Sequence, residues 1–187
     1  MENGFLRGLM SMKSPYIWAW AMAPLISPAA EYPSCNVQKD VRVAYSEKQP
    51  TDTLSVRIKG WPCYKATLNI RITGKSGKVL YAYQEPFKSH VATQWDDNTL
   101  DEDAKALADR ITHVDSFKST KQLPEWKPAD AYYEDYYQEL KVEKACYEGL
   151  RKQKWRTYTH PIHYEGWKVI VFDQEKKQTV EVSSGGL

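Results

Sequence analysis

Histidines and aromatic residues gather in one short stretch, residues 155–167, which is the part of the sequence best suited to chemistry. Two of the four histidines, His160 and His163, lie here and Glu165 follows them. Histidine and carboxylate side chains are ligands that zinc accepts. However, Pro161 favours an extended chain, in which residues three apart point to opposite faces. The spacing argues against a metal site and leaves a hydrolase, using either histidine with a carboxylate, as the enzymatic alternative.

The same stretch has the composition of a protein-binding surface. Its local structure is predicted to be a β-turn or a strand edge whose aromatic rings cover a sheet. Tyrosine, tryptophan and arginine dominate the energetics of protein interfaces. We therefore predict a binding surface made of Trp155, Tyr158, His160, His163, Tyr164 and Trp167.

A second group of tyrosines is predicted to lie on a helix that runs from Pro128 to about Arg151. Proline suits the first position of a helix. The tyrosines form two adjacent stripes with i,i+4 spacing, wider than a narrow core seam. Some hydroxyls are therefore expected to reach water or a partner. The residues of this second predicted binding surface are Tyr132, Tyr133, Tyr136 and Tyr137.

The sequence lacks the motifs of nucleophilic catalysis, phosphate binding and dinucleotide binding. The acidic residues 96–103 do not fit a calcium loop, because Asp101 stands where such a loop needs glycine. Acidic residues at the start of a helix are explained by the helix dipole. We predict neither a metal nor a cofactor. Carboxylate pairs leave no local signature, so an enzyme stays open as an alternative.

The composition narrows the class of protein. The chain has 187 residues, with 26 Lys and Arg against 24 Asp and Glu. A mean hydropathy of −0.66 is too polar for a protein that crosses the membrane several times. The charge balance lacks the basic excess of a dedicated nucleic-acid binder. An aromatic content of 13% is too high for a disordered chain, and the length suits one domain.

Residues 1–29 have the features of a signal peptide. Basic residues precede an apolar run, residues 16–26, and small residues end at Ala29, where cleavage is expected. The run is about half of the ~20 residues that a membrane-spanning helix needs. Met12 is a more typical start than Met1. We therefore predict a periplasmic or secreted protein, with residues 30–187 as a single domain and no stable membrane span after signal removal.

Export permits disulfide bonds among Cys35, Cys63 and Cys146. Apolar residues alternate in 41–45 and 54–58, and a hairpin with the pairs 45/54, 43/56 and 41/58 gives both strands one apolar face. Continuing this register places Cys35 one step from Cys63, so this pair is the predicted disulfide. A Cys63–Cys146 pair is the alternative. Lipidation of Cys35 is disfavoured because Tyr32 stands where leucine is needed.

The predicted fold class is α+β, with an antiparallel sheet of about six strands and two helices packed on one face, in the order ββββ-αα-ββ. Thr99 and Glu102 have the spacing of a capping box that starts the first helix. Residues 167–172 are apolar on both faces, which predicts a central strand. Residues 179–182 pair back against it, and 183–186 are expected to fray.

These features favour an exported, non-enzymatic domain that binds another protein in the cell envelope or outside, as an inhibitor, immunity protein or envelope accessory factor does. Nucleic acid is not an expected partner. An exported hydrolase is the first alternative. The second is a small-ligand carrier in which the helices and the sheet enclose an apolar cavity.

Overall fold

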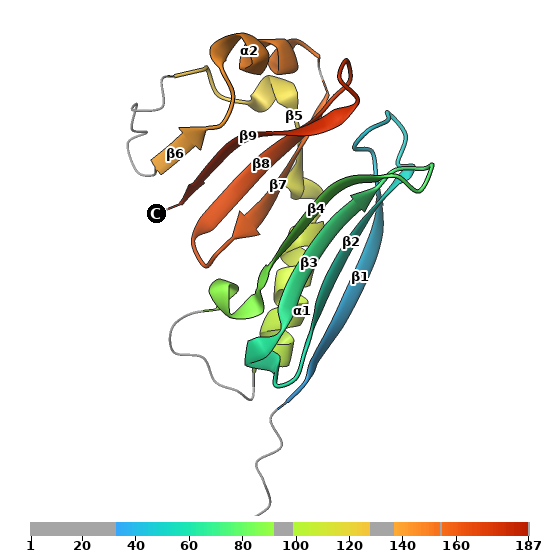
Figure 1. The fold of residues 1–187 in the computed structure, drawn as a ribbon, viewed down its shortest axis with the longest axis vertical. Coiled ribbons are helices and arrows are strands. Elements are labelled where there is room, and N and C mark those ends of the chain that lie inside the picture. Colours follow the sequence, from blue (N-terminus) through green and yellow to red (C-terminus); the bar gives the residue numbers. More distant parts are fainter. Residues whose placement is uncertain (1–32, 92–98, 128–136, 154, 187) are drawn as a thin grey trace, which may run out of the picture. The chain divides into compact units, whose positions relative to one another are not determined.

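Two antiparallel sheets and two helices form the part of the chain that the computed structural model describes, residues 33–91, 99–127, 137–153 and 155–186 (Figure 1). These residues belong to one compact unit, 32–187. The expected signal peptide lies outside the described residues. No helix among the described residues is long and apolar enough to cross a membrane. The α+β class is confirmed, whereas the single six-stranded sheet is wrong.

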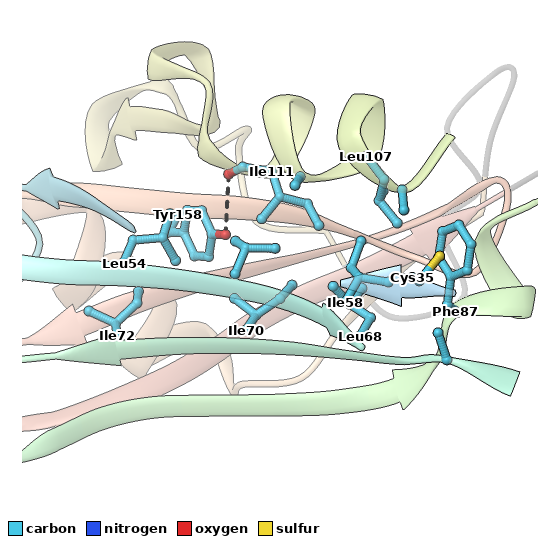
Figure 2. Close-up of a cluster of buried hydrophobic side chains, with 14 of the residues drawn as sticks. Cys35, Leu54, Ile58, Leu68, Ile70, Ile72, Phe87, Leu107, Ile111 and Tyr158 are labelled. Carbon is cyan, nitrogen blue, oxygen red and sulfur yellow. Dashed lines mark hydrogen bonds between the residues drawn. The ribbon is translucent and has the colours of Figure 1, made fainter. Parts of the chain in front are cut away.

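The first sheet has four strands in sequence order. They are β1 (Cys35–Val43), β2 (Asp52–Gly60), β3 (Thr67–Thr73) and β4 (Val79–Pro86). Apolar residues alternate with polar ones, so one face is buried and the other is wet. The buried face includes Leu54, Val56, Ile58, Leu68, Ile70 and Ile72. Helix α1 (Leu100–Thr112) covers this face with Leu107 and Ile111 (Figure 2).

The predicted start of the first helix is right in position but not in its capping. Thr99 is the N-cap residue of α1, yet its side chain makes no capping hydrogen bond. The predicted capping box with Glu102 is therefore not formed. Three carboxylates in the first turn still favour the helix through its dipole.

The predicted register of β1 against β2 is wrong by four residues. Val41 pairs with Leu54, and Cys35 pairs with Gly60. A shift by an even number leaves every side chain on its expected face. The register follows from contacts at the turn: the Tyr45 amide donates to the buried Asp52 carboxylate over 3.2 Å, and the Tyr45 ring packs 6.1 Å from that of Phe172 in the second sheet.

The predicted disulfide between Cys35 and Cys63 is confirmed, with Cα atoms 4.7 Å apart. Strand register alone does not bring these residues together. After β2 the chain turns back through the 3₁₀ helix η1 (Cys63–Lys65), and the Cys63 amide donates to the Pro33 carbonyl over 2.8 Å. Cys146 is free and half-buried.

The second sheet has five strands in the order β5-β7-β8-β9-β6. Their bounds are β5 (Phe117–Ser119), β6 (Tyr137–Leu140), β7 (Arg156–Ile162), β8 (Gly166–Asp173) and β9 (Gln178–Gly186). The prediction of a central strand at residues 167–172 is confirmed. The expected fraying of residues 183–186 is wrong, because they pair with β6 as part of β9.

The predicted long second helix is also wrong. Residues 137–140 form β6, and helix α2 spans only Lys144–Lys152. Pairing with β9 supplies hydrogen bonds that hold residues 137–140 in a strand. Tyr147 and Leu150 of α2 pack against Val171 and Val182 of the second sheet. Each helix therefore covers a different sheet, rather than both covering one face.

The hydrophobic cluster under α1 contains residues of both sheets, and a second cluster lies between α2 and the second sheet. Tyr158 of β7 is fully buried, and its hydroxyl donates to the Ile111 carbonyl of α1 over 3.3 Å (Figure 2). Trp155 donates its indole N–H to the Tyr45 carbonyl over 2.5 Å. The Tyr158 contact holds β7 against α1, and a hydrogen bond between Tyr81 and His160 joins β4 to β7.

Candidate functional site

A histidine lies buried where the two sheets meet. His160 of β7 is 1% exposed, and its ring lies beside those of Tyr81 and Tyr83 from β4. Its Nδ1 is 2.9 Å from the Pro161 carbonyl, and its Nε2 is 2.7 Å from the Tyr81 hydroxyl. A carbonyl oxygen only accepts, so Nδ1 carries the proton. In the neutral ring Nε2 then accepts a hydrogen bond from Tyr81.

Burial keeps this imidazole neutral. It lowers the pKa of His160 from 6.5 to about 4, with Lys168 and His90 lowering it further and the Pro161 carbonyl and Glu85 opposing them. Burial also raises the pKa of the Tyr81 hydroxyl. At neutral pH His160 is therefore a fixed hydrogen-bond acceptor that carries no charge.

A buried carboxylate links two further histidines to this region. Glu85 of β4 forms an ion pair with His90 of the 3₁₀ helix η2 (Phe87–His90), and both side chains are more than nine-tenths buried. Its second oxygen lies 3.4 Å from Nδ1 of His163. Burial raises the pKa of Glu85, but the neighbouring side chains of His90, Tyr83 and His163 outweigh that effect. The pKa is lowered and the carboxyl stays ionised.

His163 occupies the turn between β7 and β8. Its φ of 56° is unusual for a residue with a side chain, and its side chain is 69% exposed. Nδ1 faces Glu85, so Nε2 is the nitrogen available to solvent. A carboxylate that orients an exposed imidazole is an arrangement suited to a general base. Within the described residues, no group of three or more histidine, cysteine or acidic side chains is arranged to hold a metal ion.

Beside this turn lies an open depression of about 470 Å³. Its lining includes the cations Arg110 and Lys118, from α1 and β5, and the aromatic residues Tyr164, from the β7–β8 turn, and Trp167, from β8. The acidic residues Asp115 and Glu165 line it too. His160 lies at its inner edge. Tyr164 is 56% exposed, whereas Trp167 is half-buried. The depression combines arginine and aromatic side chains, the types enriched at protein interfaces. We call it the hairpin depression.

The structure divides the residues predicted to bind from 155–167. It brings His160, Tyr164 and Trp167 to the hairpin depression. Tyr158 faces the core, where its ring stacks 4.8 Å from that of Phe117. The side chains of Tyr158 and His160 share one face of β7 because residues two apart in a strand do so. The predicted role of these rings, to cover a sheet, therefore applies to Tyr158.

Trp155 and His163 are described by the structure but do not line the depression. Trp155 is half-buried and bonded to Tyr45. Tyr137 lies in β6, where its backbone pairs with Gly186 of β9. The prediction that Tyr137 lies on a helix is therefore wrong. The other members of the second predicted surface, Tyr132, Tyr133 and Tyr136, lie outside the described residues.

Sequence reasoning missed two features, one beside His160 and one in the turn after β2. Glu85 and His90 were not recognised, although Glu85 shares the alternating face of Tyr81 and Tyr83 and is thus a charged residue on a strand face rich in tyrosine. Trp61 is 71% exposed and follows the end of β2, next to the disulfide loop. An exposed tryptophan between Gly60 and Pro62 is a local signal that the sequence already contains.

The fold and these side chains define an α+β protein with two sheets, a disulfide and a depression lined by aromatic side chains and by charged side chains of both signs. Comparison of the chain with protein-family models, with curated proteins and with solved structures finds no match in any of the three.

Proposed function

We propose that this chain is an exported protein-binding domain, and that the hairpin depression is its binding surface. The observation that carries the proposal is the exposed ring of Tyr164 in the lining of a depression that also contains Trp167 and Arg110. Aromatic residues and arginine supply most of the binding energy at protein interfaces. Export is supported by the expected signal peptide and is compatible with the disulfide.

The turn that presents Tyr164 is sterically defined. A Cβ atom on Gly166 would lie 2.3 Å from the Ile162 carbonyl oxygen, so only glycine fits there without a shift of the backbone. Ile162 and Gly166 pair across the hairpin. A turn held in one conformation loses little entropy on binding, which favours affinity.

Tyr164→Ala is expected to weaken partner binding at least tenfold without a change in the thermal midpoint, because the ring is exposed. A photoreactive phenylalanine at position 164 should crosslink the partner in the producing cell. The partner identified by the crosslink is then purified, and calorimetry measures its dissociation constant for each variant without the crosslinker.

Trp61→Ala is the matched control, because this side chain is also large, aromatic and exposed. It lies in the turn after β2 and not in the lining of the hairpin depression. It should leave the dissociation constant within twofold of that of the unmodified chain. Loss of binding in Trp61→Ala, with binding retained in Tyr164→Ala, would show that the surface is assigned wrongly.

A hydrolase is the second candidate function, favoured by the 3.4 Å approach of Glu85 to His163. In this case His163 acts as a general base that takes a proton from water, and Glu85 orients the imidazole. The exposed Nε2 is the group that would contact the water.

This second function predicts that His163→Ala lowers kcat at least a hundredfold on any ester, peptide or glycoside that the protein cleaves. His113→Ala is the control, because His113 has a similarly exposed side chain, at 62% against 69%, but its Nδ1 faces the exposed carboxylate of Asp115 and not the buried one of Glu85. Equal losses in the two variants, or no hydrolysis by the unmodified protein between pH 5 and 9, would rule this function out.

A further inference from the structure

Helix α1 leaves one face of the first sheet uncovered (Figure 1). This face carries a groove of about 520 Å³. Its three charged lining residues are the cations Arg57, Lys59 and Arg71, all of them exposed. The whole chain has a net charge of only +2, so this is a local concentration of positive charge. We call it the cationic groove.

The strand register fixes how closely the cations lie. Arg57 and Lys59 are two residues apart on β2, which places their Cα atoms about 7 Å apart on one face. Arg57 pairs with Asn69, so Arg71 is its diagonal neighbour on β3, at about 7–8 Å. Three like charges at this spacing repel one another, and a ligand with two or more anionic groups would relieve that repulsion.

One carboxylate, Asp40, lies near the groove but does not neutralise it. Hydrogen bonds from Ser55 and Gln38 lower the pKa of Asp40, and the charge of Arg57 contributes less. The Gln38 amide donates to Asp40 over 2.8 Å. Among the described residues, neither Lys59 nor Arg71 forms an ion pair. Both cations are therefore free to meet a ligand.

The uncharged lining indicates the class of ligand. Amides and hydroxyls line the groove at Asn36, Gln38, Ser55, Asn69 and Thr73, and Val37 is its single apolar lining residue. Amides and hydroxyls both donate and accept hydrogen bonds, as the hydroxyl groups of a sugar require. Among the described residues, the lining has no aromatic ring to stack a nucleic-acid base and no apolar pocket to anchor a peptide side chain.

We propose that the cationic groove binds an acidic oligosaccharide, whose carboxylate or sulfate groups contact Arg57, Lys59 and Arg71. The planar guanidinium groups of the arginines suit bidentate contacts with either anion. The amide side chains of the groove then bind the sugar hydroxyls. This site is separate from the hairpin depression and does not depend on the partner proposed for it.

Titration calorimetry with a tetramer of galacturonic acid, and separately with a heparin tetrasaccharide, tests the proposal and distinguishes carboxylate from sulfate. At least one acidic tetramer should bind, more weakly at 200 mM than at 50 mM NaCl. A neutral galactose tetramer should not bind. Failure of both acidic tetramers at millimolar concentration would overturn the proposal. Tighter binding of a (dT)4 oligonucleotide or a tetraglutamate peptide would overturn it equally.

The double variant Arg57→Gln, Arg71→Gln should weaken binding of the acidic tetramer at least tenfold. Both side chains are exposed, so the thermal midpoint should not change. The control is Lys121→Gln, Lys152→Gln, which removes the same charge from exposed positions outside the groove. It should bind within twofold of the unmodified protein. Equal weakening in the two variants would mean that net charge, and not the groove, attracts the ligand.

Discussion

Replacement of both Cys35 and Cys63 by alanine is expected to lower the free energy of unfolding by about 3–4 kcal/mol. The disulfide closes a loop with a sequence separation of 28 residues and so restricts the unfolded chain. Both cysteines are also buried in the core, at 2% and 1% exposure. Urea denaturation at neutral pH measures the difference through the midpoint and the slope.

Cys146→Ala is the control for this prediction, because Cys146 is free and half-buried in α2. Its replacement should cost about 1 kcal/mol or less. Reduction of the unmodified protein should reproduce the loss seen in the double variant. A double variant within 1 kcal/mol of the unmodified protein would contradict the stabilising role of the disulfide.

The strands of the first sheet could be predicted because their signal is local. Leu54, Val56 and Ile58 alternate with polar residues, and this pattern identifies both the strand and its buried face. Register is different, because every shift by an even number of residues keeps the same face. The observed register depends on Tyr45, whose hydroxyl donates to Thr179 in β9 over 3.2 Å. No pattern within the hairpin contains that contact.

The second helix was predicted too long for a similar reason. The strand β6 exists because residues 137–140 pair with residues 183–186, which include two glycines and carry no strand pattern of their own. Neither segment identifies its partner in the sequence. Helical spacing of tyrosines over 132–137 could therefore not be weighed against a strand pairing between segments more than forty residues apart.

Only the residues that the β7–β8 hairpin contributes to the candidate site could be predicted from the sequence. Residue types alone directed attention to His160, Tyr164 and Trp167, which the fold does bring to the hairpin depression. The lining residues Arg110 and Lys118 come from α1 and β5 and have no motif in common with the hairpin. Packing brings them to the site, so a single sequence indicates the aromatic residues of the hairpin and not the charged residues of the other elements.

His160 also predicts how stability depends on pH. The pKa of this group is about 4 in the folded protein and 6.5 as its ordinary value. Between these values the unfolded chain binds more protons than the folded one, so stability falls as the pH falls. The free energy of unfolding is expected to drop by about 2 kcal/mol from pH 7 to pH 5 through this residue.

The pH range isolates His160 from the carboxyl groups. Glu85 and Asp173 have lowered pKa values, and their ordinary values are 4.5 and 3.8. The stability that they contribute is complete above those values and is lost only as the pH falls through their folded pKa. Measurements at pH 5 and above therefore leave out their titration.

His160→Gln should remove most of the 2 kcal/mol dependence, because glutamine does not titrate and its amide can still accept from Tyr81. His113→Gln is the control, since it removes an exposed histidine and should leave the dependence intact. The comparison uses urea denaturation of each variant at pH 7 and pH 5. The expected pH dependence arises because the buried imidazole stays neutral in the folded protein. If the free energy of unfolding of His160→Gln depends on pH as strongly as that of the unmodified protein, the folded protein must protonate this ring at pH 5. That result would contradict the hydrogen bonds of His160 with Tyr81 and Pro161.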